Sequence, residues 1–139
     1  MAERVDAMNY KALGEVVELR FYLKAFEKGL IVSKPFGDSA KYDFIVDSGN
    51  GLYRVQVKST QRLDTSNRGN RYTVSFCCSG DKRIYKNEEI DFIVAYITPL
   101  DTWYIIPITA IHSKNGNFRP HKDGKGKMEE YKEAWGLFK

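Results

Sequence analysis

The chain has 139 residues, 42% of them hydrophobic and 29% charged, and a formal net charge of +4 with a pI near 9.0. No apolar run approaches the ~20 residues that a membrane helix needs, and the N-terminus has no apolar signal-peptide core, so we expect neither a membrane nor a secreted protein. The length suits a single domain over residues 1–139. The basic balance permits an anionic partner, most commonly nucleic acid.

The cysteine and histidine residues indicate which cellular compartment and which kind of metal site to expect. Cys77 and Cys78 are adjacent and cannot form an ordinary disulfide framework, so we expect a reducing cytoplasm. With no Cys-x-x-Cys pair and only His112 and His121, zinc-site spacing is absent from the sequence.

Residues 9–28 are predicted to form a long helix, because they are rich in long-chain helix formers, contain no proline and precede Gly29. Helical projection gives one solvated side (Arg20, Lys24, Glu27, Lys28) and a wide apolar arc expected in the core (Ala12, Val16, Leu19, Phe21, Tyr22, Leu23, Ala25, Phe26). Glu15 and Glu18 fall inside that arc. Either they reach the rim and pair with Arg or Lys, or they serve a metal site.

Residues 42–59 are predicted to form a β-hairpin. A strand over 42–47 is followed by the turn Ser48-Gly49-Asn50-Gly51, and strict alternation marks a second strand over 52–58. Period two places Arg54, Gln56 and Lys58 on one face and Tyr53, Val55 and Val57 toward the core. The hairpin brings Asp43 toward Gln56 and Lys58. A carboxylate, an amide oxygen and an ammonium at one sheet edge suit a hard metal ion with a cation beside it; the alternative is an exposed sheet face with ordinary polar side chains.

The other segments alternate between strands and polar loops. We expect strands over 30–35, 72–76, 90–97 and 102–107; the run over 90–97 is apolar enough for a central strand covered on both faces. One helical turn is possible over 84–89. The loop 36–41 enters the Asp43 strand, and 59–71 and 111–127 are predicted to be basic loops, either DNA-contacting or merely solvated. Residues 128–138 resemble a short amphipathic helix anchored by Tyr131, Trp135 and Phe138.

The hairpin residues carry a family resemblance. Asp43 followed by Gln56-x-Lys58 resembles the Asp…(Glu/Gln)-x-Lys core of the PD-(D/E)XK nucleases. VQVK after YDFIVD is most similar to group I intron-associated endonucleases, and archaeal Holliday-junction resolvases are next. The pattern DFIVAYITPLDTWYIIPI extends the resemblance to about residues 10–110. One departure is that only Ser79–Glu89 is available where the superfamily usually has a helix between its third and fourth strands.

The resemblance implies an α/β (α+β) fold with a restriction-endonuclease-like core, in which a mixed central β-sheet is flanked by a long N-terminal helix and a short C-terminal helix. It implies a Mg²⁺-dependent endonuclease acting on DNA, with Mn²⁺ as a possible substitute, of the intron homing type. Holliday-junction resolution, restriction or repair cleavage, and DNA binding without cleavage are the alternatives. Cutting two strands with one site per chain implies a homodimer or higher homo-oligomer.

The resemblance also assigns roles to residues. Asp43 would be the central metal ligand, Gln56 would coordinate through its amide oxygen or hold a metal-bound water, and the Val57 carbonyl could add a ligand. The first-helix glutamate of the family corresponds to Glu18, with Glu15 in reserve. Lys58 would lie near the nucleophile, orienting it or stabilising developing charge, and proximity to the metal is expected to lower the pKa of Lys58. Gln56 in place of Glu leaves the site one negative charge poorer, which predicts weaker metal binding or one ion rather than two. The predicted DNA contacts are Lys41, Arg62, Arg68, Arg71, Arg119 and Lys122.

Overall fold

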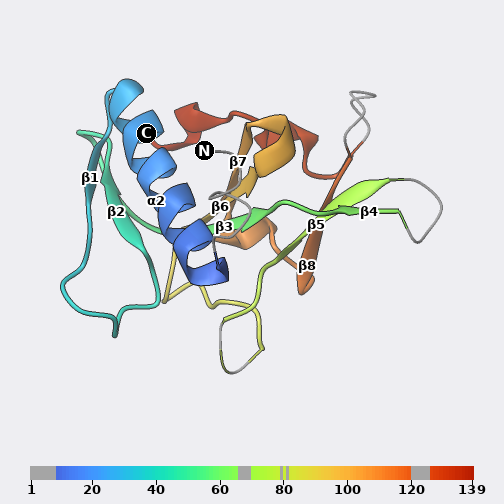
Figure 1. The fold of residues 1–139 in the computed structure, drawn as a ribbon. Coiled ribbons are helices and arrows are strands. Elements are labelled where there is room, and N and C mark those ends of the chain that lie inside the picture. The colour runs from blue at the N-terminus through green and yellow to red at the C-terminus, as the bar shows by residue number, and fades with distance from the viewer. Residues whose placement is uncertain (1–8, 66–69, 79, 81, 120–125) are drawn as a thin grey trace.

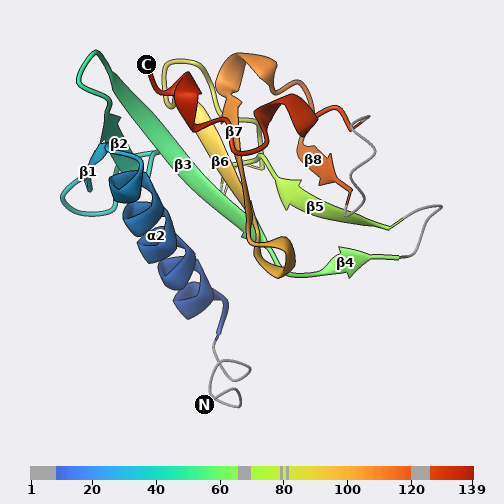
Figure 2. The ribbon, with the colours of Figure 1, turned by 90° about the horizontal axis from the view of Figure 1, so that it is seen from above.

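The computed structural model describes residues 9–65, 70–78, 80, 82–119 and 126–139. One long helix, α2 (Tyr10–Glu27), packs on a mixed sheet, and a smaller sheet packs on the opposite face (Figures 1 and 2). The larger sheet has the order β1-β2-β3-β6-β7: β1 (Ile31–Ser33), β2 (Phe44–Asp47), β3 (Leu52–Thr60), β6 (Phe92–Ile97) and β7 (Thr102–Pro107). The smaller sheet has the order β4-β5-β8: β4 (Leu63–Asp64), β5 (Arg71–Ser75) and β8 (Asn115–Phe118). This is the mixed α+β architecture with a long N-terminal helix that the sequence predicts. None of the helices formed by these residues is both long enough and apolar enough to span a membrane.

The helix α2 begins and ends where the sequence predicts. The Asn9 side chain caps it by accepting a hydrogen bond from the Ala12 N–H at 2.8 Å, and Gly29 follows its end with φ of 83°. Only a narrow stripe of the helix is buried, formed by Val17, Phe21 and Ala25.

The expected wide apolar arc is wrong, because several of its large side chains are 46–70% exposed (Leu19, Tyr22, Leu23, Phe26). A single helix lying on a sheet buries only the side chains at i, i+4 and i+8 that face the sheet. Nothing in the described part of the chain covers the helix from outside (Figure 2).

The larger sheet places the hairpin next to the central strand. β2 pairs antiparallel with β3 in a register that sets Phe44 opposite Val55. β3 then runs parallel to β6, with Lys58 opposite Ala95. All six residues of β6 are buried, as predicted for a strand covered on both faces. Its side chains alternate between two cores, so that Val94 packs under α2 while Ala95 packs under the smaller sheet.

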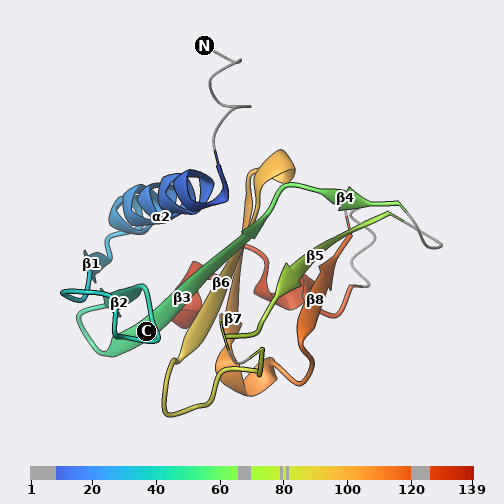
Figure 3. The ribbon, with the colours of Figure 1, turned by 60° about the horizontal axis from the view of Figure 1, so that its bottom comes forward.

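The second face of the sheet is covered by strands, which answers the question raised by the missing helix. β3 continues beyond Lys58 to Thr60, and the chain then enters β4, as Figure 3 shows. The predicted basic loops are therefore shorter than expected: β4 and the first residue of β5 interrupt 59–71, and β8 interrupts 111–127. Close packing explains Gly116 in β8, because a Cβ there would lie 2.2 Å from Cζ of Phe76.

The C-terminal segment is not an α-helix. It forms two 3₁₀ turns, Glu129–Tyr131 and Trp135–Leu137, separated by Glu133 with φ of 49°. The polar groups of the edge strand β7 account for this, since Glu133 N–H donates to the Trp103 carbonyl at 2.7 Å and its carboxylate accepts from Trp103 N–H at 2.7 Å. Satisfying a sheet edge outweighs the local helical pattern. The predicted anchors Trp135 and Phe138 are buried.

Candidate active site

The site is built where β2 begins beside the middle of β3. The Asp43 N–H donates to the Val55 carbonyl at 2.8 Å, and the Asp43 Oδ2 accepts from the Val57 N–H at 2.8 Å. Phe44 and Val55 point into the core under α2, so the alternation of the strands puts Asp43, Gln56 and Lys58 together on the other face. The hairpin prediction is confirmed at this point.

Lys58 is held by groups far away in the sequence. Its half-buried ammonium donates a hydrogen bond to the Cys77 carbonyl at 3.1 Å and lies 5.5 Å from the centre of the Tyr85 ring. Burial lowers the pKa of Lys58, and the nearby Asp43 carboxylate partly opposes that effect. Burial therefore lowers the pKa of Lys58 in the expected direction, while the expected contribution of a nearby metal stays a prediction.

The environment of Asp43 shows which charges meet here. Burial raises the pKa of Asp43 from 3.8 to about 6; the Val57 N–H lowers it, the Glu18 carboxylate raises it, and the Lys34 and Lys58 ammoniums lower it. Glu18 comes from the helix and Lys58 from the opposite face of the sheet. Both act on one carboxylate because Asp43 lies at the margin where the sheet begins.

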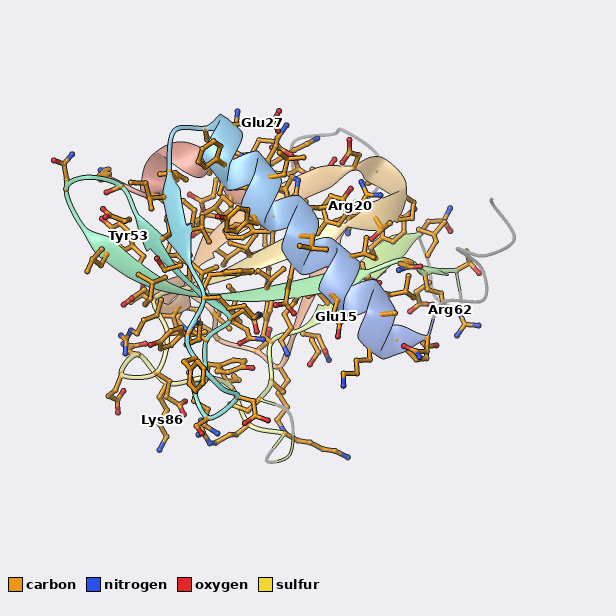
Figure 4. The ribbon with its side chains drawn as sticks, turned by 60° about the vertical axis from the view of Figure 1, so that its left-hand side comes forward. Glu15, Arg20, Glu27, Tyr53, Arg62 and Lys86 are labelled. Carbon is orange, nitrogen blue, oxygen red and sulfur yellow. The ribbon has the colours of Figure 1, made fainter. Side chains whose placement is uncertain are left out.

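Glu18 forms the rim ion pair that is one of the two explanations for a glutamate in the helical arc, while its role as a metal ligand stays a prediction. The Oε1 of Glu18 accepts a hydrogen bond from Lys34 Nζ at 2.7 Å, which is a rim ion pair. The negative charge of Glu18 also raises the pKa of Asp43. Glu15 lies one turn earlier and is exposed (Figure 4). Both glutamates line a cavity of about 450 Å³ with Leu19, Tyr22, Lys34 and Phe44, the residue that follows Asp43 in the chain. The preference for Glu18 over Glu15 remains a prediction that this geometry favours.

The donor set suits a hard divalent ion. Gln56 is partly exposed, and its side chain has no hydrogen-bond partner within the described ranges, so its amide oxygen is available. Asp43 uses only one carboxylate oxygen for the Val57 N–H. Oxygen ligands from Asp43, Glu18, Gln56 and the Val57 carbonyl are those that Mg²⁺ prefers. In the part of the chain described, no three His, Cys, Asp or Glu side chains gather into a metal site of their own, so the set depends on the amide and carbonyl oxygens.

Arg54 shares the face of Gln56 and Lys58, but its role is structural. Its guanidinium binds both carboxylate oxygens of Asp91 at 3.1 Å and donates to the carbonyls of Asn87 and Glu88. These bonds tie the turn before β6 to β3, which fixes the two strands that carry the site.

Sequence reasoning missed two side chains of the site. Lys34 follows the short strand β1, and Tyr85 comes from the segment between the two sheets. Neither lies in a motif: Lys34 is a lysine before a proline, and Tyr85 is an aromatic residue in a polar stretch. Only the fold brings them to Glu18 and Lys58.

The predicted DNA contacts fall into three groups. Lys41, Arg62 and Arg119 are exposed, and Figure 4 shows Arg62 beyond the N-terminal end of α2. Arg71 lies in β5 and pairs with Asp64 at 3.8 Å. Arg68 and Lys122 lie outside the described residues.

Comparison with known proteins agrees with this geometry. The PD-(D/E)XK endonuclease family matches residues 8–138, so the chain belongs to that family. A solved structure of a bacterial homing endonuclease, I-Ssp6803I, is similar with a TM-score of 0.79 and 26% sequence identity, over 94% of this chain and 93% of that one. A comparison with curated proteins found no match.

Proposed function

We propose that this chain is a divalent-metal-dependent endodeoxyribonuclease of the homing endonuclease type, acting as one domain. The observation that carries the proposal is the arrangement of Glu18, Asp43 and Lys58 from three separate elements around one margin of the sheet. The similarity to a homing endonuclease favours that type over a junction resolvase or a restriction or repair nuclease.

The roles of the side chains follow from their chemistry. Asp43, Glu18, the Gln56 amide and the Val57 carbonyl would hold Mg²⁺, with Mn²⁺ as a substitute. Such an ion would supply Lewis-acid stabilisation of the charge on the phosphate and a lowered pKa for a bound water. The Val57 N–H orients Asp43, and Lys58 orients the attacking water or stabilises developing charge. The lowered pKa of Lys58 suits an ammonium that works close to proton transfers.

DNA would approach the site along the exposed cations. Lys41 lies two residues before Asp43, and Arg62 follows the end of β3. Contacts of this kind with phosphates position a duplex without reading its sequence. Because one site per chain cuts one strand at a time, we propose a homodimer or higher homo-oligomer with a symmetric interface. The unpaired state of Cys77 and Cys78 is compatible with a reducing compartment.

A cleavage assay tests the proposal. Supercoiled plasmid, linear duplex and a four-way junction are incubated side by side with the protein, with Mg²⁺ or with EDTA. We expect Mg²⁺-dependent cutting of duplex DNA. Selective cutting of the junction would instead favour a resolvase.

The variant Lys58→Ala separates cleavage from binding. We expect it to lose about 10²- to 10⁴-fold in cleavage rate, with DNA affinity by fluorescence anisotropy within a few-fold of the wild type. Lys28→Ala, at an exposed position just after α2, is the matched control. DNA binding by the wild type with no cleavage under any condition would favour the non-cleaving alternative and refute the enzyme.

A further inference from the structure

Lys34 holds Glu18 at the entrance of the candidate site. It follows β1, which lies beside the C-terminal half of α2 (Figure 1), and its Nζ is 2.7 Å from Oε1 of Glu18. The same Nζ lies 5.0 Å from the centre of the Phe44 ring, the residue next to Asp43. The ammonium is therefore placed between the helix glutamate and the start of β2.

Two ammoniums oppose the carboxylates at this margin while no divalent ion is bound. Glu18 and Asp43 are two carboxylates, and Lys34 and Lys58 are two ammoniums, each of which acts on Asp43. Lys34 thus supplies positive charge where a divalent ion would later supply it. An ion bound by Glu18 must compete with this ammonium or displace it.

The Lys34 contact is also easy to break. Its side chain is 62% exposed, whereas that of Glu18 is 27% exposed, and exposed ion pairs of this kind contribute little stability. The lysine stem is flexible and compact ammoniums are common partners of phosphates. Once released, Lys34 would remain at the mouth of the site, where the DNA backbone has to pass.

We infer that Lys34 is a tethered cation that pairs with Glu18 while the site holds no divalent ion, and that it moves to a phosphate oxygen of DNA when Glu18 binds the ion. Lys34 is then a positioning residue that links metal binding to DNA binding. This inference rests on the proposed function, because it takes the same Glu18 as a metal ligand.

The first test measures Mg²⁺ binding by calorimetry without DNA. We expect Lys34→Met, which keeps an apolar stem over Phe44 but lacks the charge, to bind Mg²⁺ roughly three- to tenfold more tightly than the wild type. Lys34→Arg keeps the positive charge and should bind Mg²⁺ with wild-type affinity. Lys28 is an exposed lysine without a carboxylate partner in the described structure, so Lys28→Met should leave the Mg²⁺ affinity unchanged.

The second test measures affinity for a fluorescein-labelled linear duplex by anisotropy in Ca²⁺, which takes the same oxygen ligands. We expect Lys34→Met to bind about three- to tenfold more weakly and to lower the slope of log affinity against log salt by about one, as for one lost phosphate contact. A purely structural role of Lys34 would not change that slope.

The outcomes separate this inference from the function on which it rests. If the wild type binds Mg²⁺ and Lys34→Met has the same metal affinity or the same salt slope as the wild type, the proposed role of Lys34 is overturned. The nuclease proposal is then unaffected. Wild-type protein that binds no Mg²⁺ would overturn both.

Discussion

Replacing Asp43 by asparagine separates the stability of the fold from the chemistry of the site. The amide oxygen introduced by Asp43→Asn can still accept the hydrogen bond that the Val57 N–H now donates at 2.8 Å, so the junction of β2 and β3 is kept. The substitution removes a negative charge that burial and Glu18 disfavour. We therefore expect Asp43→Asn to stabilise the metal-free protein while abolishing cleavage.

The magnitude follows from the pKa of Asp43. A rise from 3.8 to about 6 corresponds to roughly 3 kcal/mol at 1.36 kcal/mol per pKa unit. Because Asp43 is only partly buried, solvent screening reduces this to about 1–2 kcal/mol.

The sign of the pH dependence is fixed by proton binding. The folded protein binds the Asp43 proton more tightly than the unfolded chain, so the free energy of unfolding of the wild type falls as pH rises through the interval from 3.8 to about 6. The advantage of Asp43→Asn is thus complete above that interval and vanishes below it.

Urea unfolding in EDTA measures this difference at pH 8, where the advantage is complete, and at pH 4, near the lower end of the interval, where only a small part of it remains. Asp38→Asn is the matched control, because Asp38 is an exposed carboxylate in the loop leading to the same strand; we expect a change of less than about 0.5 kcal/mol. An Asp43→Asn protein that is no more stable than the wild type at pH 8, or equally stabilised at both pH values, would refute the reasoning. Saturating Mg²⁺ should then stabilise only the wild type, by about 2.7 kcal/mol at one hundred times its dissociation constant.

Three further substitutions probe the site and the core. Gln56→Glu adds the missing carboxylate, so calorimetry should show tighter Mg²⁺ binding or a second bound ion. Unchanged affinity and stoichiometry would refute the idea that Gln56 weakens metal binding by leaving the site one negative charge poorer. Tyr85→Leu removes the ring beside Lys58 and should slow cleavage about three- to thirtyfold at unchanged Mg²⁺ affinity. Tyr85→Phe keeps the ring and should cleave at the wild-type rate. Equal cleavage rates for the two variants would show that the contact between the ring and Lys58 does not contribute to cleavage. Trp135→Ala removes a buried ring whose centre lies 5.8 Å from that of Phe21, and it should lower the free energy of unfolding by about 3–5 kcal/mol. The control Leu52→Ala, at an exposed position, should lower it by less than about 0.5 kcal/mol. Similar losses of stability in the two variants would contradict the anchoring role of Trp135.

The helix and hairpin show how far local pattern reaches. The bounds of α2 follow from Asn9, Gly29 and the residues between them, because capping and propensity act over a few neighbours. Local pattern does not determine which apolar side chains of the helix are buried, because burial depends on what packs against the helix. The buried residues of α2 are Val17, Phe21 and Ala25. Likewise Met128–Phe138 has a helical pattern but forms 3₁₀ turns along the edge of β7.

The sequence by itself determined the alternation that puts Gln56 and Lys58 on one face of a strand, and the turn that returns that strand to Asp43. Period two and turn chemistry are local, so they can be read along the chain. The tertiary structure alone decided that Glu18, Lys34 and Tyr85 join them, because helix, edge strand and connecting loop meet there only after the sheet has formed. Contacts between residues far apart in the chain depend on packing that no short stretch encodes.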